Sequence, residues 1–489
     1  MSLFPKDLGQ AYARLVLCAA LALVTAGSIA GCGAGYRPVV TPITPTGPAS
    51  QPASNVFVIS VPSPTSQGIG TVINYSGDTV MATAPVGPSP VTFSLDETGT
   101  TGYSFNSDRT VSNLPVTNQL QAKNITFTTL PSTARPVNLF SPSAGLWVSD
   151  LDGNVIDVLT GSPETFKLAI PVAATPVMVT GPAVIGQRNY AITQGAVATG
   201  VDCNNSPTTG PAGEADGLEI ASFTVSSRIP LGKCPVYAVQ SPDSQRLFVL
   251  NRGSDTITVI NSQNNTLNAC APFVNQIGRT VTCHPSLPLS TAAGLTGSGV
   301  PAVAGPVYAE YNIATSQLLV ADYDGNAVTV IDVSLDEFGN DSATFGTTFT
   351  IPVGANPASV TALYDGSRAY SANQTDGTVT VMNLTSHTVE KTVAVTGHPR
   401  TVVSTQNSLY GKVYVASPDT PYLTILRTDQ DIVDTTVLVQ GNVIDVRTST
   451  QNGVSGNLNT TSRSPGYGQP CYLPGTAASA SYATCTALP

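Results

Sequence analysis

From residue 55 onward, apolar and polar residues alternate with a period of two, which is the pattern of β-strands. Five segments share one plan, in which a short strand and a second alternating strand flank a turn containing Gly, Asp or Pro. Equivalent apolar residues of the two strands are ten residues apart, as in Leu247 and Ile257. The pattern therefore predicts an all-β protein built from repeated hairpins, at 145–159, 246–260, 317–331, 368–382 and 412–426.

Each hairpin is preceded by a strand that begins at a proline and is followed by a further strand. Around 357–397 the four strands read PASVTALY, RAYSANQ, TVTVMNL and TVEKTVAV. Units of four strands that recur about every 40–45 residues are typical of β-propeller blades. The strand-starting prolines are 40 to 71 residues apart, at Pro90, Pro136, Pro176, Pro235, Pro306, Pro357 and Pro399.

The second strand of each unit gives an independent count of the blades. An aromatic residue or leucine marks it in eight segments, at Phe57, Tyr103, Trp147, Tyr190, Phe248, Leu319, Tyr370 and Tyr414. The first segment lacks a first strand, and GNVIDVRTS at 441–449 supplies one from the other end of the chain. We expect a single propeller over 55–449 whose ends share one blade, which removes open sheet edges. Eight blades are favoured, and seven are the alternative because 100–130 is irregular.

The repeats resemble the YVTN family of β-propellers, found in bacterial and archaeal envelope and surface-layer proteins. The family pattern is Tyr-Val-Thr-Asn, a glycine turn, and a strand that ends Val-Ile-Asp. Here Phe248-Val249-Leu250-Asn251 leads to Thr258-Val259-Ile260-Asn261, and Tyr370-Ser371-Ala372-Asn373 leads to Thr380-Val381-Met382-Asn383. The resemblance implies the fold and leaves the activity open, because propellers serve many functions.

The N-terminus has the features of a lipoprotein leader. Lys6 and Arg14 precede an apolar run, Leu15–Ile29, which is too short to span a bilayer comfortably and suits a signal peptide. The run ends in Ser28-Ile29-Ala30-Gly31-Cys32, which resembles a bacterial lipobox. By this resemblance, residues 1–31 are removed, Cys32 carries the lipid, and Gly33 favours the outer membrane or cell surface over the inner membrane. The proline-rich segment 32–54 then forms a tether, and an ordinary secretory signal is the alternative.

Six cysteines remain beside Cys32 and the leader's Cys18. An even number in an exported chain implies disulfides, for which six cysteines allow fifteen connectivities. Pairing of sequence neighbours gives Cys203–Cys234, Cys270–Cys283 and Cys471–Cys485. The first four fall in or near inserts at about 200–217 and 270–305, and the last two in a disulfide-tied tail, 450–489. Metal binding is the competing interpretation, and the absence of a C-x-x-C motif disfavours it.

The low content of charged residues and the negative net charge restrict the classes of partner that we expect. Only 10% of the residues are charged, and the net charge is −10. Nucleic-acid binding requires a basic stripe, and adhesion to anionic lipid by charge requires a polybasic patch. The composition indicates neither, and it suits an exported protein that contacts an envelope protein, a glycan or another copy of itself.

Candidate chemistry is sparse. The three histidines, His284, His387 and His398, are scattered over different units. Two turns read Asp-x-Asp-Gly-Asn and offer weak Ca²⁺ candidates, although the same side chains also stabilise turns by hydrogen bonds. Glu310 and Asp445 lie on first strands, which line a propeller's channel, where they are candidate channel ligands or an acid/base pair. The turn candidates are Asp150, Asp152, Asp322 and Asp324.

The sequence favours a non-enzymatic function. We expect a lipid-anchored, extracytoplasmic propeller that acts as a binding or assembly scaffold in the cell envelope, with no bound cofactor. One alternative is a hydrolase with a site at the channel mouth, because related propellers include lactone hydrolases. The other is a redox propeller that holds a cofactor, against which the lack of a channel histidine counts.

Overall fold

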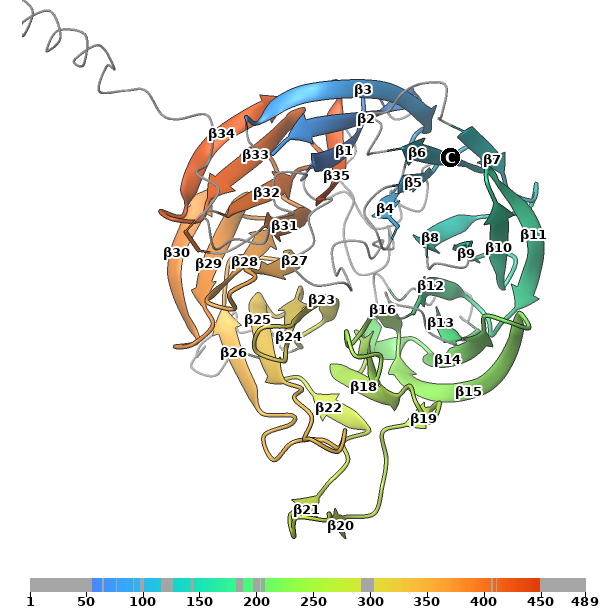
Figure 1. The fold of residues 1–489 in the computed structure, drawn as a ribbon. Helices are drawn as coiled ribbons and strands as arrows, with labels where there is room; N and C mark the ends of the chain where they lie inside the picture. Colours follow the sequence, from blue (N-terminus) through green and yellow to red (C-terminus); the bar gives the residue numbers. More distant parts are fainter. Residues whose placement is uncertain are drawn as a thin grey trace, which may run out of the picture. The chain divides into compact units, whose positions relative to one another are not determined.

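The computed structural model describes residues 55–448, apart from gaps at 64–65, 76, 91, 97–100, 116–125, 142–144, 182–187, 197–202, 204–206, 292–302, 406–407 and 410. The described strands form eight antiparallel sheets and one separate two-stranded hairpin. Seven of the sheets have four strands and one has five, and neighbouring strands follow one another in sequence except where β35 pairs with β1 and β22 with β18. The innermost strands of successive sheets contact one another in a closed circle (Figure 1). The sheets are therefore the blades of an eight-bladed β-propeller, which confirms the predicted fold and the favoured blade count.

Within the first four blades, the strands run from the innermost position outward as follows. Blade 1 comprises β35 (Asn442–Thr448), β1 (Asn55–Val61), β2 (Gln67–Asn74) and β3 (Thr79–Pro88). Blade 2 comprises β4 (Thr92–Leu95), β5 (Thr101–Phe105), β6 (Thr110–Pro115) and β7 (Thr126–Thr129). Blade 3 comprises β8 (Pro136–Phe140), β9 (Leu146–Asp150), β10 (Val155–Gly161) and β11 (Glu164–Pro171). Blade 4 comprises β12 (Pro176–Thr180), β13 (Arg188–Thr193), β14 (Ala212–Glu219) and β15 (Thr224–Lys233).

The remaining blades follow the same order. Blade 5 comprises β16 (Pro235–Gln240), β17 (Arg246–Asn251), β18 (Thr256–Asn261) and β19 (Thr266–Leu267), with β22 (Ser286–Pro288) also paired to β18. Blade 6 comprises β23 (Pro306–Asn312), β24 (Gln317–Asp322), β25 (Ala327–Asp332) and β26 (Thr348–Pro352). Blade 7 comprises β27 (Pro357–Ala362), β28 (Arg368–Asn373), β29 (Thr378–Asn383) and β30 (Thr388–Ala394). Blade 8 comprises β31 (Thr401–Thr405), β32 (Lys412–Ala416), β33 (Tyr422–Arg427) and β34 (Ile432–Leu438).

Blade 1 joins the two ends of the propeller. β35 pairs antiparallel with β1, and Asp445 lies opposite Ile59 in the register. The ring is thus closed by backbone hydrogen bonds between strands that are almost 400 residues apart in sequence. As predicted, the C-terminal strand supplies the innermost position that the N-terminal segment lacks.

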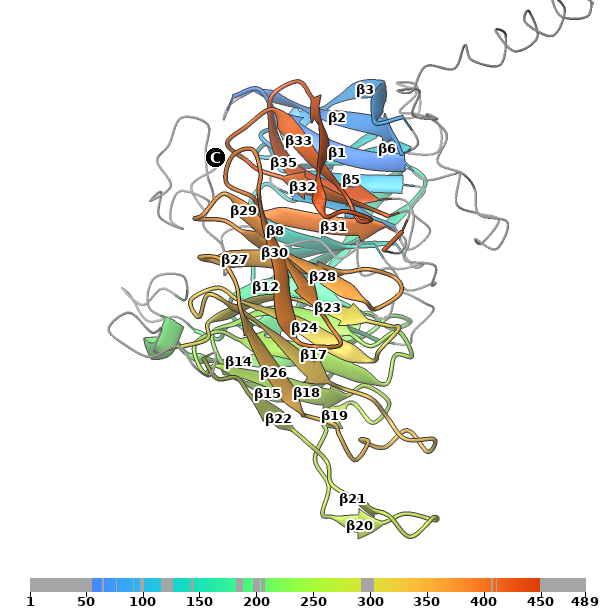
Figure 2. The same ribbon diagram turned by 90° about the vertical axis from the view of Figure 1, so that its left-hand side faces the viewer.

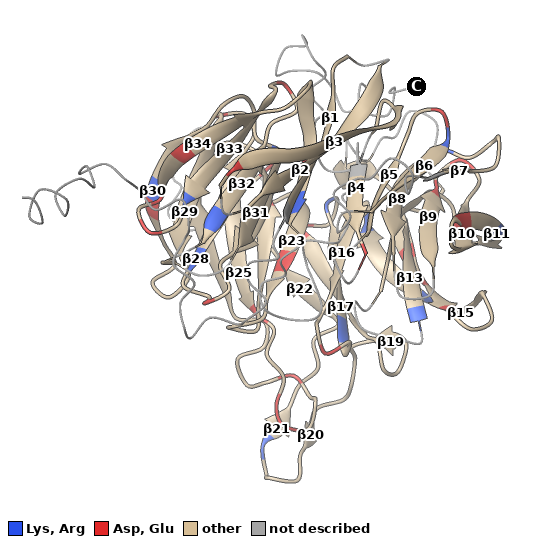
Figure 3. Ribbon diagram, turned by 45° about the horizontal axis from the view of Figure 1, so that its top comes forward, with Lys and Arg blue, Asp and Glu red and all other residues tan. Residues whose placement is uncertain are grey.

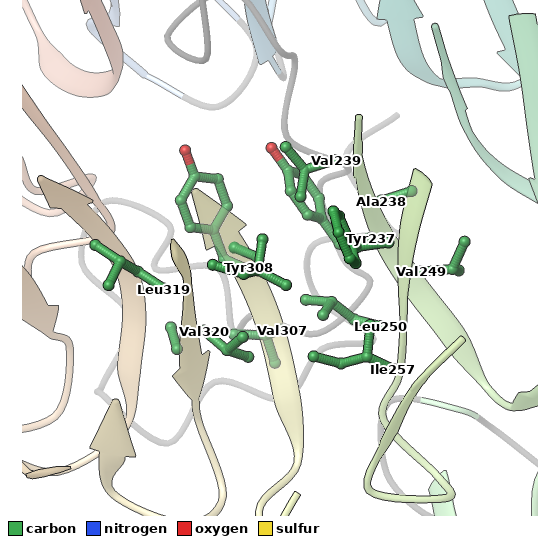
Figure 4. Packing of buried hydrophobic residues seen from close by; sticks show 14 of the residues in the cluster. Tyr237, Ala238, Val239, Val249, Leu250, Ile257, Val307, Tyr308, Leu319 and Val320 are labelled. Atoms are coloured by element: carbon green, nitrogen blue, oxygen red, sulfur yellow. The ribbon is translucent and has the colours of Figure 1, made fainter. Parts of the chain in front are cut away.

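Both faces of the inner three strands are buried, because each blade packs between two neighbours. Strands β16 and β17 are buried along their whole length, whereas most of β30 is exposed. The tyrosines Tyr237 and Tyr308, from the inner strands of blades 5 and 6, lie side by side with ring centroids 4.8 Å apart (Figure 4). Apolar surface on both sides of each sheet therefore holds the ring together.

The polar residues that alternate along the third strands are buried as well. In blade 5, Asn251 Nδ2 donates to Oγ1 of Thr256 (3.2 Å) and of Thr258 (2.9 Å). In blade 7, Asn373 Nδ2 makes the same two contacts with Thr378 (3.0 Å) and Thr380 (2.8 Å). Such pairing removes most of the cost of burying hydroxyl and amide groups. The period-two pattern thus marks one apolar face and one hydrogen-bonded polar face, and both faces are buried. It does not mark one buried face and one solvent-exposed face.

Most strand-starting prolines are followed by a change of register. The pairing of the inner strand shifts just after Pro136, Pro176, Pro235, Pro306 and Pro357. A proline has no N–H to donate, so it is tolerated at the first residue of a strand or beside a bulge. This accounts for the regular prolines that mark the blades in the sequence.

The expected leader (1–31), tether (32–54) and tail (450–489) lie outside the described residues, and so do Cys32, Cys471 and Cys485. Within the described part of the chain, no helix has the length and hydrophobicity needed to cross a bilayer. The insert expected at about 200–217 lies earlier in the chain, at residues 194–211, because Ala212–Glu219 forms the third strand of blade 4. It contains η3 (Pro207–Thr209), a short 3-10 helix.

Candidate functional site

The inner strands are joined side by side through polar side chains. Each inner strand has backbone N–H groups on the edge that faces no strand of its own blade. In β12, β16, β27 and β31, side chains from a neighbouring blade accept hydrogen bonds from these groups. Asn138 Oδ1 accepts from Val179 N (3.0 Å), Met178 Sδ from Ala238 N (3.2 Å), and Ser359 Oγ from Val402 N (3.1 Å). Asn138 and Ser359 on the inner strands therefore join neighbouring blades.

Glu310 belongs to this series. Its side chain is 1% exposed, and Oε1 accepts from Ala362 N (2.8 Å) and Thr361 Oγ1 (3.2 Å) of blade 7. Oε2 has no hydrogen-bond partner among the described residues. Burial raises the pKa of Glu310 to about 7, although the two hydrogen bonds oppose the shift. Glu310 thus joins blades 6 and 7 and keeps its proton to a higher pH than an exposed glutamate does.

Asp445 lies in a different environment on β35. Its Oδ1 accepts from Arg447 Nη1 (2.9 Å) and from the N–H of Val446 (2.9 Å). Burial lowers the pKa of Arg400, and the charge of Asp445 opposes that shift. Glu310 contacts blade 7 while Asp445 is paired within blade 1, so the two acids are held in separate contacts. Their role as channel ligands stays a prediction.

The four aspartates of the Asp-x-Asp-Gly-Asn turns are held by protein groups. Asp150 Oδ1 accepts from Arg135 N (2.8 Å) and Gly153 N (3.2 Å), and Asp152 pairs with the Arg135 guanidinium (3.2 Å). Asp324 binds Arg252 of blade 5 through both oxygens, at 2.9 and 2.8 Å. The described residues contain no group of three or more His, Cys, Asp or Glu side chains placed to hold a metal ion.

Two buried aspartates, Asp322 and Asp157, occupy positions at which other blades have an amide or a hydroxyl side chain. Asp322 takes the place of Asn251 and accepts from Thr329 Oγ1. Burial raises the pKa of Asp322 to about 8, and Asp255 and Asp324 add to the shift. Asp157 takes the place of Thr258, and burial with the nearby Asp150 raises its pKa to about 7. Both acids therefore keep their protons to a higher pH than an exposed aspartate does.

Ion pairs between blades recur at one position that the sequence analysis missed. A basic residue at the start of a second strand reaches an acid in the turn after the third strand of the next blade. The pairs are Arg246–Asp341 (3.1 Å), Arg368–Asp431 (2.8 Å) and Lys412–Asp78 (2.6 Å). The sequence feature that marks these pairs is a basic residue followed directly by an apolar and an aromatic residue, in RLF, RAY and KVY. Charges are sparse over the propeller, as Figure 3 shows, and these pairs use several of them.

Both described disulfides close inserts on neighbouring blades. Cys203–Cys234 ties the blade-4 insert, residues 194–211, to the connection between β15 and β16, with a Cα–Cα distance of 5.5 Å. Cys270–Cys283, with a Cα–Cα distance of 5.4 Å, closes an insert in blade 5. Two of the three predicted disulfides are confirmed, and the third lies outside the described residues.

The blade-5 insert, residues 268–285, interrupts the outermost strand of its blade. β19 pairs with one end of β18, and β22 pairs with the other end. Between them the chain leaves the blade and forms the hairpin of β20 (Phe273–Val274) and β21 (Thr280–Val281). Figures 1 and 2 both show this hairpin projecting away from the blades. The disulfide joins the points where the chain leaves and re-enters the blade.

Asp341 fixes the base of the hairpin. Its fully buried carboxylate accepts from Arg246 Nη2 (3.1 Å) and Asn268 Nδ2 (2.8 Å). It also accepts from the backbone N–H of His284 (3.0 Å) and lies 3.0 Å from the ring Nδ1. The His284 ring stacks on Phe345, with centroids 5.3 Å apart. The carboxylate of Asp341 thus holds Asn268 and His284, at the two ends of the insert, against blades 5 and 6.

A second aspartate, Asp336, contacts the hairpin farther from the blade than Asp341 does. Asp336 accepts from the N–H groups of Phe338 and Asn340, both at 2.9 Å. It also contacts Asn275 Nδ2 (3.4 Å) and Arg279 Nη2 (3.5 Å) of the hairpin. Burial opposes ionisation of Asp336, but the hydrogen bonds outweigh it and lower the pKa. A charged contact therefore connects the hairpin to the 334–342 loop of blade 6.

Comparison with solved structures agrees with this fold. Apo AztD from Citrobacter koseri superposes with a TM-score of 0.54 and 12% identity, over 81% of this chain and 97% of that chain. The dihydro-heme d1 dehydrogenase NirN, in complex with DHE, gives a TM-score of 0.53 and 11% identity, over 83% of this chain and 78% of that one. At such identities the likeness shows the propeller fold alone. No protein-family model matches the chain, and no curated protein matches its sequence.

Proposed function

We propose that this chain is a lipid-tethered, extracytoplasmic β-propeller that works as a binding scaffold in the bacterial cell envelope. One observation carries the proposal: both described disulfides close inserts on the neighbouring blades 4 and 5. Disulfides persist in oxidising compartments outside the cytosol. Loops that a rigid scaffold holds in place commonly bind partners.

The scaffold presents its blade-4 insert to an envelope protein, a glycan or another copy of the chain. The insert is held by Cys203–Cys234 and by Lys233 Nζ, which donates to the carbonyl of Thr208 (3.2 Å). Thr208 and Thr209 are exposed at its end. The alternative of a hydrolase with a channel-mouth site has weaker support, because Glu310 and Asp445 are held in separate contacts.

Photo-crosslinking in cells tests this proposal. A photoreactive amino acid replaces Thr208 in one variant and Leu438, which is 60% exposed on β34 of blade 8, in the control. We expect a discrete adduct or a ladder of self-assemblies from position 208 and none from position 438. A clean monomer from both positions would argue against a scaffold and direct attention to small ligands at the channel.

A further inference from the structure

The end of the blade-5 hairpin exposes an uncharged tip, residues 273–278, that carries three apolar side chains. Val274 and Ile277 are 66% and 62% exposed, and Phe273 is 42% exposed. From Ala271 to Gly278 the sequence has no ionisable side chain. In a globular domain, exposed apolar side chains gathered on one projection indicate a contact surface.

The tip is ordered by its own hydrogen bonds. Asn275 Oδ1 accepts from the N–H groups of Ile277 (3.2 Å) and Arg279 (2.9 Å), and Gly278 closes the turn with a φ of +78°. The first charged residue, Arg279, turns its guanidinium back to the carbonyl of Asp341 (2.9 Å). The apolar side chains are therefore presented in a fixed arrangement, with the charge held at the base.

A hairpin of this size needs outside support. Two strands alone are marginally stable in water, and in this insert Cys270–Cys283 and the Asp341 contacts supply the support. A surface that is already ordered loses little conformational entropy on binding. The hairpin is thus built to make contact through its tip.

The chemistry of the tip selects among possible occupants. Two such tips would bury far less than the roughly 800 Å² per partner of a stable dimer. Protein hot spots are rich in Trp, Tyr and Arg and poor in Val, whereas the tip offers Phe273, Val274 and Ile277. A bilayer favours Phe, Val and Ile and penalises charge. We infer that the tip inserts into the interface of a lipid bilayer and orients the propeller on the membrane.

This inference rests on the proposed function, because the lipid on Cys32 would keep the hairpin near a membrane. A tether turns the second contact into an intramolecular one, with an effective concentration in the millimolar range. A contact of three apolar side chains, too weak to recruit a free protein, then suffices to hold the orientation. The acidic propeller would not bind anionic lipid by charge, so the contact must be apolar.

Quenching of tryptophan by brominated lipid tests the insertion. The full chain has one tryptophan, Trp147, which is fully buried in blade 3 and gives the background signal. The variants Phe273→Trp and Ile277→Trp place a probe in the tip. Phe166→Trp, at a residue 41% exposed on β11, is the matched control. Each chain is mixed with phosphatidylcholine vesicles, with and without bromine on the acyl chains.

We expect brominated vesicles to lower the tip emission by about twofold, as for a residue 5–10 Å deep in the interface, and to leave the control unchanged. Each probe reports only on its own residue, so anchoring elsewhere in the chain does not give the signal. Vesicle-bound chains whose tip probes are both unquenched would overturn the inference and leave the scaffold untouched. Equal quenching of the Phe166→Trp control, or a tip covered by a stoichiometric protein, would overturn it as well.

Discussion

The acid at position 322 gives the most quantitative prediction. Asp322 occupies the place where Asn251 and Asn373 donate to two threonine hydroxyls, and it is 1% exposed. In the variant Asp322→Asn the new amide can donate to Thr329 as those asparagines do to their threonines. We expect a more stable propeller whose stability depends less on pH.

The size follows from the pKa of Asp322, which rises from 3.8 to about 8 on folding. The unfolded side chain loses its proton near pH 4, whereas the folded one keeps it to about pH 8. The stabilisation is therefore fully present below pH 4 and is lost as the pH rises to 8. At about 1.4 kcal/mol per unit, Asp322 should remove roughly 4 kcal/mol of stability between pH 5 and pH 8.

Equilibrium denaturation in urea at pH 5 and pH 8 measures this difference. The stability gap between Asp322→Asn and the parent should widen by roughly 4 kcal/mol from the lower pH to the higher, with similar denaturant slopes. The reverse change in blade 7, Asn373→Asp, is the matched control and should introduce the same pH dependence. Parallel pH profiles for the parent and Asp322→Asn would show that Asp322 is ionised in the fold, which would refute the reasoning.

Three further variants test other contacts. Lys412→Met leaves the Asp78 carboxylate without its ion pair at the junction of blades 8 and 1. We expect urea denaturation to show a free energy of unfolding lower by about 3–5 kcal/mol. A decrease below about 1 kcal/mol would show that the pair does not secure ring closure. Asn251→Ala removes three side-chain hydrogen bonds and should lower the free energy of unfolding by about 1–3 kcal/mol in the same assay. An unchanged midpoint would contradict the stated role of the buried amide. Replacing Cys270 and Cys283 together by Ser should speed proteolysis within the hairpin at least about tenfold with little change in the melting temperature of the blades; equal cleavage rates would show that the disulfide does not hold the hairpin.

The blades could be predicted because each repeats one pairing register. The ten-residue offset between Leu247 and Ile257 is the hairpin register of β17 and β18, which pair directly at Leu250 and Ile257. The same register recurs in neighbouring blades, so an error in one unit would have conflicted with the others. The shared blade could also be predicted, because the N-terminal segment lacked a strand that the C-terminal segment had in excess.

The hairpin could not be predicted in the same way. Its insert splits a strand, and the halves of that strand, β19 and β22, are two and three residues long. Such short pieces carry no periodic signal. Asp341, which anchors the insert, lies 57 residues from His284 and in another blade. Such a contact depends on how neighbouring blades meet and is not encoded in any local pattern.

The candidate acids show a second limit of the sequence pattern. Glu310 and Asp445 both lie on inner strands, as expected, but strand position does not fix the direction of a side chain. Glu310 turns to the backbone of Ala362, and Asp445 to Arg447. The motif of Asp150 to Asn154 likewise proved to be a turn whose first carboxylate binds backbone N–H groups.

Intact-mass analysis of the chain purified from the cell envelope, under denaturing and non-reducing conditions, tests the central claim most directly. We predict a chain that begins at an acylated Cys32 and in which none of Cys203, Cys234, Cys270, Cys283, Cys471 and Cys485 can be alkylated. An unacylated chain that retains its leader, or one with two or more free thiols among these cysteines, would contradict an extracytoplasmic, lipid-tethered propeller.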